Sequence, residues 1–207
     1  MSRQGREFQV YEDGRRCVVG VIPVLPNHPA ALDPSTAGSS GSGSGSDAGA
    51  ASAAAATSTP PRIVLVSSRK DHDRWVLPKG GWDLGAADGT ETRTESAARE
   101  AWEEAGLRGS LADAPVWEFD EPMTSTTGIR TPEKTRTPCR YTFFAMAVDE
   151  RLATWPEAGE RARQAFSVDE ALDRLARHHN PVMRDALQAW VAAHPALMTP
   201  SSSSDSA

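Results

Sequence analysis

Three glutamates crowd one short stretch of this chain, at Glu100, Glu103 and Glu104. If the stretch is helical, residues three and four apart are neighbours on one face, so the carboxylates come close together and repel one another. A divalent cation with oxygen ligands would offset that repulsion, and magnesium commonly binds one or two carboxylates together with substrate phosphates. The expected chemistry is therefore metal-assisted hydrolysis of a phosphate. The simpler interpretation is a solvated acidic helix face on which Arg99 pairs with Glu103.

The stretch that carries these glutamates has the start and stop signals of a helix. Thr92-Arg-Thr-Glu95 is typical of a capping box, in which the Thr92 side chain accepts from a backbone amide and the Glu95 side chain reaches back. Gly106 stands where helices commonly end in the left-handed conformation. The buried side of this helix is expected to consist of Ala97, Ala98, Ala101, Trp102 and Ala105.

Strands are expected on both sides of this helix along the chain. The apolar, β-branched run 17–25 is typical of a strand covered on both faces, although Pro23 cannot donate to a ladder and is expected to disturb it. Further strands are predicted at 62–67, 74–77, 116–119, 140–148 and 164–166, and two more helices from Ser167 and from Asn180-Pro181. This order of elements predicts an α/β fold, an α/β/α sandwich with a mixed sheet.

The composition separates one foldable domain from low-complexity segments. Of the 207 residues, 33–59 are rich in Gly, Ser and Ala, and the last stretch is rich in Ser, so neither can bury enough apolar surface to fold. We therefore expect a single domain formed by 1–32 and 60–196. The segment 33–59 is expected to be a disordered insertion, and 197–207 a disordered tail.

Charge and cysteine content narrow the function classes. A net charge of −6 argues against a general binder of nucleic acid or of membrane surfaces. No segment approaches transmembrane length, and the first residues lack the apolar region of a secretory signal. Cys17 and Cys139 lie in apolar, strand-like runs and are expected to be reduced core residues. These features predict a cytoplasmic or nuclear protein, and a monomer is favoured.

The glutamates also belong to a longer pattern. Seven residues fit the spacing G-x5-E-x7-R-E-U-x-E-E-x-G-U, in which U is apolar: Gly85, Glu91, Arg99, Glu100, Glu103, Glu104 and Gly106. This pattern resembles the Nudix box of hydrolases that act on nucleoside diphosphates linked to another moiety. The resemblance implies the Nudix sandwich fold, Mg²⁺ (or Mn²⁺) bound by Glu100 and Glu104, and Glu103 as the base. It also implies that an ion pair between Arg99 and Glu91 braces the loop against the helix.

The loop before the helix allows two interpretations of its glycines. Gly85 satisfies the spacing, but Pro78-Lys-Gly-Gly81 is similar to the stretch that follows the strand in related proteins. If the loop carries an insertion around 84–90, the glycines that matter are Gly80 and Gly81, whose backbone can approach metal and phosphate for want of a side chain. We favour this second interpretation, which leaves the glutamates unaffected.

Sequences outside the box resemble one branch of the Nudix family, the diphosphoinositol polyphosphate phosphohydrolases, in their fungal form. The similarity covers most of 5–25 and 62–193, and it includes the stretches from Asp73 to Gly81 and from Phe166 to Leu172. It implies a small polyphosphorylated substrate: the pyrophosphate of diphosphoinositol polyphosphates, with diadenosine polyphosphates and inorganic polyphosphate as further substrates.

Such a substrate requires cations around a shell of phosphates, for which arginine offers a planar fork and lysine a point charge. The expected substrate contacts are Arg15, Arg16, Arg69, Lys70, Lys79, Gly80, Gly81, Arg140, Arg161 and Arg163. Lys79 stands out because it lies in the loop beside the glutamates. Gln9 stands near the position where animal relatives carry an arginine.

Two other functions fit the same residues. The first keeps the chemistry but prefers nucleotides, as a diadenosine polyphosphate hydrolase. The second is a non-catalytic module that binds polyphosphate. The intact glutamates argue against a pure binder, because clustered carboxylates destabilise a helix that has no use for them.

Overall fold

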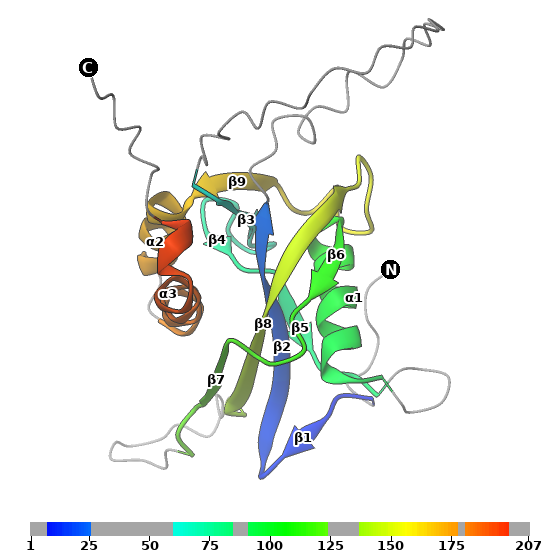
Figure 1. Cartoon of the computed structure of the whole chain (residues 1–207). Helices are drawn as coiled ribbons and strands as arrows, with labels where there is room; N and C mark the ends of the chain where they lie inside the picture. The colour runs from blue at the N-terminus through cyan, green and yellow to red at the C-terminus, as the bar shows by residue number, and fades with distance from the viewer. Residues whose placement is uncertain (1–7, 26–59, 85–90, 124–136, 178–180, 199–207) are drawn as a thin grey trace, which may run out of the picture.

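The computed structural model describes residues 8–25, 60–84, 91–123, 137–177 and 181–198 (Figure 1). The predicted insertion at 33–59, Gly85 and residues 199–207 of the predicted tail lie outside these ranges. The strands are β1 (Tyr11–Glu12), β2 (Arg15–Leu25), β3 (Arg62–Ser67), β4 (Trp75–Val76), β5 (Lys79–Gly81), β6 (Leu107–Leu111), β7 (Trp117–Asp120), β8 (Cys139–Arg151) and β9 (Arg163–Ser167). The helices are α1 (Arg93–Ala105), α2 (Val168–Ala176) and α3 (Val182–Ala193), followed by a 3-10 turn at Pro195–Leu197.

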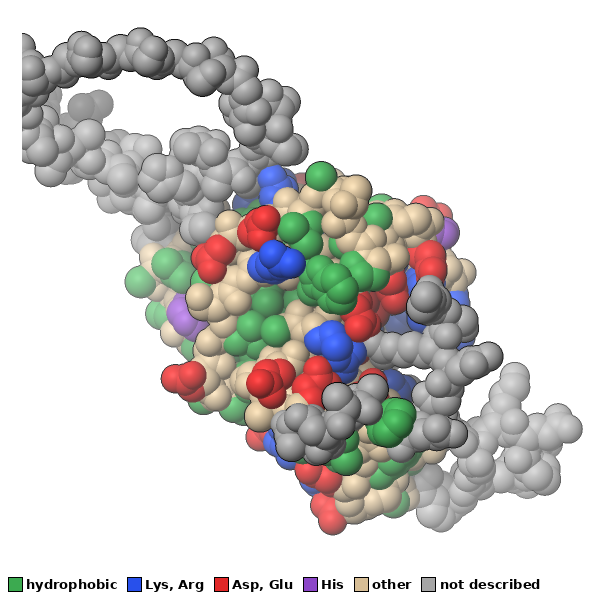
Figure 2. Space-filling model, turned by 90° about the vertical axis from the view of Figure 1, so that its right-hand side faces the viewer, with side chains coloured by type: hydrophobic (Ala, Val, Ile, Leu, Met, Phe, Trp, Pro, Cys, Tyr) green, Lys and Arg blue, Asp and Glu red, His purple; other side chains and the backbone are tan. Residues whose placement is uncertain are grey.

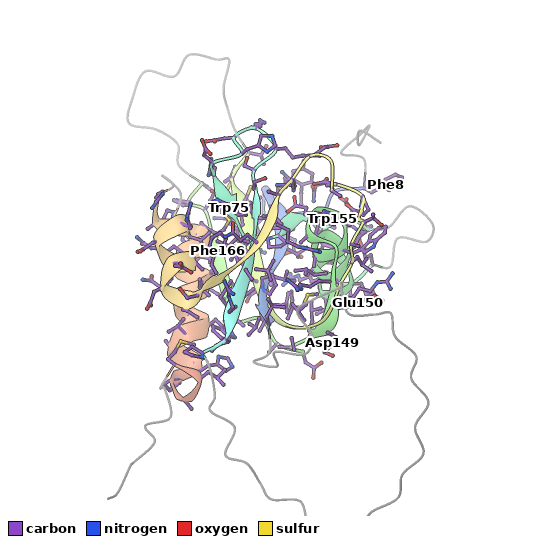
Figure 3. All side chains as sticks on the ribbon, turned by 90° about the horizontal axis from the view of Figure 1, so that it is seen from above. Phe8, Trp75, Asp149, Glu150, Trp155 and Phe166 are labelled. Atoms are coloured by element: carbon purple, nitrogen blue, oxygen red, sulfur yellow. The ribbon has the colours of Figure 1, made fainter. Side chains whose placement is uncertain are left out.

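The strands form one mixed sheet, as the sequence predicts. Its main path runs β4-β3-β2-β8-β6, with β1 and β5 on β2, β7 on β8 and β9 on β3. The long strands β2 and β8 are parallel and stay in register from Arg16↔Cys139 to Val24↔Ala147, whereas the other pairs are antiparallel. Seen from above in Figure 3, the sheet lies between α1 on one side and α2 with α3 on the other. The α/β/α sandwich is therefore confirmed.

The core lies on both faces of the central strands. Val21, Ile22, Ile63 and Leu65 are fully buried in adjacent strands, and Phe143 is buried beside them in β8. Burial of apolar surface on both faces explains why these strands are continuous apolar runs in the sequence. No helix among the described residues is long and apolar enough to cross a membrane.

Two details of the strands differ from expectation. Pro23 does not disturb β2, since its register with β8 is unbroken on either side of the proline; neighbours on both edges hold the strand extended. Strand β6 is not among the strands that the sequence predicted, and its pairing with β8 shifts register between Arg108 and Gly109. A side chain at Gly109 would collide with the carbonyl of Ala147, so the glycine permits the close pairing of β6 with β8.

Helix α1 has the ends that the sequence predicts but a rotated buried face. Thr92 and Glu95 form the capping box, and Gly106 adopts φ 59° at the other end. Trp102 was expected in the core and is 39% exposed. The inward face is instead shared by alanines and two acids, Glu100 and Glu104, which rotates Trp102 to the outside. Figure 2, which faces this side of the molecule, shows hydrophobic side chains exposed among acidic and basic ones.

Candidate active site

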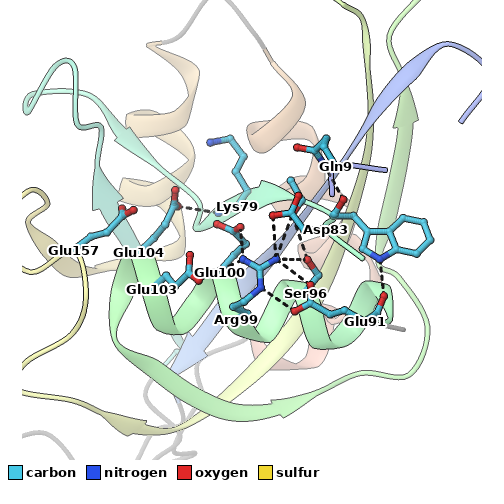
Figure 4. Close-up of polar contacts among 12 residues, drawn as sticks. Gln9, Lys79, Asp83, Glu91, Ser96, Arg99, Glu100, Glu103, Glu104 and Glu157 are labelled. Atoms are coloured by element: carbon cyan, nitrogen blue, oxygen red, sulfur yellow. Dashed lines mark hydrogen bonds and ion pairs between the residues drawn. The ribbon is translucent and has the colours of Figure 1, made fainter. Parts of the chain in front are cut away.

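Arg99 organises the acidic face of α1 (Figure 4). Its guanidinium donates to both carboxylate oxygens of Glu91, at 2.8 and 3.1 Å, which is the ion pair expected between loop and helix. The same group reaches Glu100 at 3.0 Å and Glu103 at 3.4 Å. With Asp83 at 3.8 Å, this one arginine contacts four acids, and its planar fork fixes their relative positions.

Glu100 is held in a narrow space beneath β5. Its side chain is 2% exposed, and a Cβ at Gly80 would lie 2.1 Å from its carboxylate. Gly80 therefore leaves room for a glutamate side chain, rather than for the approach of a phosphate to the backbone. The packing of Glu100 gives a physical reason for Gly80, different from the predicted one, while Gly85 lies outside the described residues.

Gly81 leaves room for the side chain of Gln9 in the same way. A Cβ at Gly81 would collide with the Gln9 side chain, which donates to the carbonyls of Cys17 and Trp82 at 3.1 and 2.8 Å. The Gln9 oxygen accepts from Arg16 Nε at 2.9 Å. Gln9 thus fastens the end of β5 to β2, a function that the sequence did not reveal.

Glu104 is buried and bound on both oxygens. Its Oε2 accepts the backbone N–H of Lys79 at 3.0 Å, and its Oε1 accepts Arg161 Nη2 at 2.6 Å. Burial raises the pKa of Glu104 to about 7, while the positive charges of Lys79 and Arg161 oppose that rise. A buried carboxyl with a pKa near neutrality costs little to protonate, and a bound cation would favour its charged form.

The acids on α1 fit a hard divalent cation. Glu100 and Glu104 offer carboxylate oxygens, and each ionised carboxylate has about four lone-pair positions, of which the neighbouring donors of Glu104 use two. Across the described part of the chain, no three acidic, His or Cys side chains converge closely enough to hold a metal alone. Magnesium does not need three, because one or two carboxylates with substrate phosphates and water complete its shell.

A cavity of about 470 Å³ shares two of its wall residues, Lys79 and Arg161, with the surroundings of Glu104. Six cations line it: Arg16, Arg69, Lys70, Arg74, Lys79 and Arg161. Lys79 and Arg161 belong to the cavity wall and also contact Glu104, the first through its backbone N–H and the second through its guanidinium, whereas none of the three clustered glutamates of α1 lines the cavity. Burial lowers the pKa of the Lys79 amine, with the charge on Glu104 acting against that shift. A cationic cavity on a chain of net charge −6 indicates a strongly anionic ligand.

The structure brings five of the eight expected cations together and places three elsewhere. Arg15 donates to the Glu121 carbonyl at 2.9 Å, because it points to the opposite side of β2 from its neighbour Arg16. Arg140 is bound by Glu12, Asp13 and Asp120 in a surface cluster. Arg163 points to the end of α1, where it donates to the Ala105 carbonyl at 2.7 Å. These three were expected at the substrate and do not line the cavity.

Two charged residues of this site were missed. Arg74 lines the cavity and stands directly before β4. It belongs to the stretch from Asp73 to Gly81 that resembles the related hydrolases, and this resemblance could have indicated it as a substrate contact. Glu157, in the β8–β9 loop, accepts from Arg161 Nε at 2.6 Å and from Arg69 at 3.2 Å. It joins two cations of the cavity wall and lies beside Glu104 in Figure 4. Nothing in the local sequence marks it.

Comparison with known proteins adds to this geometry. A family model described as NUDIX domain matches residues 49–186. Nudix hydrolase 16, mitochondrial, of Arabidopsis thaliana is 35% identical over 187 residues, which cover 90% of this chain and 86% of that protein. Diphosphoinositol polyphosphate phosphohydrolase 3-alpha of Mus musculus is 28% identical over 129 residues, 61% of this chain and 66% of that protein. Among solved structures, a NUDIX hydrolase from Nitrosomonas europaea has a TM-score of 0.52 at 14% identity and covers 86% of this chain and 90% of its own, a likeness of fold.

Proposed function

Because this chain belongs to the Nudix hydrolase family, we propose that it hydrolyses the pyrophosphate of diphosphoinositol polyphosphates and, as secondary substrates, diadenosine polyphosphates. The observation that carries the proposal is the cavity of about 470 Å³ lined by six cations, two of which also contact Glu104. A ring that bears phosphates on most of its carbons needs positive charge from several directions at once. The cations come from the β3–β4 loop, from β2 and β5, and from the β8–β9 loop, so they surround a ligand instead of lining one edge.

The roles of the acids follow from their exposure. Glu103 is the base: its side chain is partly exposed, whereas Glu100 and Glu104 are buried, so only Glu103 has free access to water. It takes a proton from a water molecule as the water oxygen bonds to phosphorus and the bond from phosphorus to the bridging oxygen breaks. Arg99, at 3.4 Å, holds the Glu103 carboxylate in place.

Glu100 and Glu104 would hold Mg²⁺, which Mn²⁺ could replace; a divalent ion there lowers the pKa of water and neutralises phosphate charge. The cations of the cavity bind the phosphates that do not react, and they withdraw charge from the leaving group. We further propose that the protein acts as a monomer in the cytoplasm or nucleus, on small substrates and not on nucleic acid.

A diadenosine polyphosphate hydrolase is the second candidate, and one observation favours it. The wall of the cavity also includes Tyr141, Val182 and Met183, which present aromatic and apolar surface instead of charge. A nucleobase could lie against such a surface, since its ring needs apolar contact. A fully phosphorylated ring makes less use of it.

A substrate panel tests both candidates. We would measure phosphate release in magnesium from a diphosphoinositol polyphosphate and from diadenosine polyphosphates, and compare kcat/KM. A higher kcat/KM for the inositol substrate supports the proposal, and a preference for the nucleotide selects the second candidate.

The variant Glu103→Gln controls for the chemistry. It preserves the shape of the side chain and removes the base, so we expect kcat to fall by about 10²–10⁴. Undiminished turnover by this variant would exclude Glu103 as the base. Binding without turnover by the unaltered protein would support a non-catalytic module.

A further inference from the structure

The carboxyl end of α1 is fastened by a segment far away in the sequence. Four successive carbonyls at this end, those of Glu103, Glu104, Ala105 and Gly106, receive hydrogen bonds from the segment 152–163. The N–H of Glu157 donates to Glu103 at 3.1 Å, and the Trp155 indole N–H to Glu104 at 3.2 Å. Arg163 donates to Ala105 at 2.7 Å and to Gly106 at 3.2 Å, and the Leu152 N–H also reaches Gly106 at 2.8 Å.

This arrangement answers an electrostatic problem of the helix itself. The carboxyl end of a helix carries a partial negative charge, which disfavours acidic side chains there. Glu103 and Glu104 stand in the last turn of α1, and this helix, which is described throughout, has no basic residue in that turn. The positive charge must come from elsewhere in the fold, and Arg163 brings it to the terminal carbonyls themselves.

Trp155 holds Arg163 in that position. The Arg163 guanidinium lies 4.4 Å from the centre of the Trp155 ring, in cation–π geometry. Trp155 in turn packs on Gly106, where a Cβ would come within 2.8 Å of the Trp155 Cβ. The glycine that ends the helix thus has two functions: it adopts φ 59°, and it makes room for the tryptophan.

We infer that Arg163 and Trp155 are positioning residues, which fix the last turn of α1 and with it the carboxylates of Glu103 and Glu104. The inference rests on the hydrolase activity and not on the identity of the substrate. Arg163 belongs to β9, which pairs with β3 in the central sheet. Arg163 and Trp155, which we call the clamp, therefore connect the carboxyl end of α1 to the core of the sheet. If this tie is lost, the helix end can shift, and a misplacement of about 1 Å costs about 10² in rate.

The test replaces Arg163 and Trp155 and measures two quantities. Binding of Mn²⁺ alone is measured by calorimetry, without substrate, and kcat and KM are measured by phosphate release. For Arg163→Met we expect Mn²⁺ affinity to fall about tenfold, as for other residues that orient metal ligands, and kcat to fall by about 10–10², with KM changed less than about twofold. Trp155→Phe keeps the ring and removes the indole donor, so both effects should be about threefold.

Controls separate positioning from simple loss of stability. Arg62→Met removes an arginine that likewise donates to a backbone carbonyl, that of Ala165 in β9 at 2.6 Å, but lies away from α1, and it should leave kcat and Mn²⁺ affinity unchanged. Arg163→Lys restores the charge and should recover part of both quantities. Because Arg163 and Trp155 act together, the double variant should lose less than the product of the two single effects.

Two results would overturn the inference. A raised KM with unchanged kcat and Mn²⁺ affinity would make Arg163 a substrate contact, and a lowered melting temperature with both quantities unchanged would make the clamp merely structural. If Arg163→Met does not fold, Arg163→Lys and Trp155→Phe carry the test, and unchanged values in both refute it. Since Mn²⁺ binding needs no substrate, failure of the proposed substrate would leave this test intact.

Discussion

Replacing Gly80 by alanine gives the sharpest test of how the acidic site is packed. The added Cβ would lie 2.1 Å from the Glu100 carboxylate, whereas ordinary contact begins near 3.4 Å. The carboxylate must therefore retreat by about 1 Å, and it has little space to do so, because it is 2% exposed and bound to Arg99 at 3.0 Å. Either the carboxylate leaves its position or β5 moves away from α1.

Both outcomes have calculable consequences. Overpacking of this kind typically costs about 1–3 kcal/mol of stability, which lowers the melting temperature by about 2–12 °C in a domain of this size. Displacement of a metal-binding carboxylate by about 1 Å should lower kcat by about 10². We therefore expect a folded but nearly inactive protein, with weaker binding of Mg²⁺.

The chain offers a matched control for this substitution. Gly159 lies in the β8–β9 loop, and a Cβ there would meet nothing within 4 Å. Gly159→Ala should therefore leave both melting temperature and kcat unchanged. The assays are thermal unfolding and phosphate release in magnesium. If Gly80→Ala retained normal kcat, Glu100 could not be held as tightly as its surroundings indicate, and its role as a metal ligand would be refuted.

Three further predictions concern the protonation of Glu104, the binding of the substrate and the segment 33–59. Burial raises the pKa of Glu104 from its ordinary 4.5 to about 7. Between pH 4.5 and about 7, the folded, metal-free protein therefore keeps a proton on Glu104 that the unfolded chain has already released. The melting temperature measured in a chelator should therefore fall as pH rises from 4.5 to about 7, and the affinity for Mg²⁺ should rise over the same interval. Melting curves of the variant Glu104→Gln should lack this pH dependence. The same pH dependence in both proteins would contradict the raised pKa of Glu104. Lys70→Met should raise KM about tenfold, because it removes a charged contact with a substrate phosphate. Arg15→Met should leave KM unchanged, because Arg15 binds the Glu121 carbonyl and does not line the cavity. Equal KM values for the two variants would speak against the cavity as the substrate site. Deletion of residues 33–59 should preserve kcat, and a large loss would mean that this segment reaches the site.

The sequence predicted the parts of the fold that depend on neighbours along the chain. Local hydrogen bonding specifies the two ends of α1, through the capping box at Thr92 and the glycine at 106. Apolar runs specify the strands at 62–67 and 140–148. Pro23 and β6 show where this reasoning fails, because pairing in the sheet overrode the local signal at both places. Trp102 shows a related limit, since its orientation depends on which face of α1 meets the sheet.

The sequence alone predicted the acidic site on which the proposed chemistry depends. Glu100, Glu103 and Glu104 specify an acidic site because their separation follows from the geometry of one helix. Only the tertiary structure decided where the cations act. Arg161 reaches Glu104 across 57 positions of the chain, and Arg163, two residues further on, turns to the end of α1. Residues two apart on one strand share a face, but Arg161 lies in the β8–β9 loop outside the sheet. Arg163 begins β9, so its direction is set by the pairing of β9 with β3.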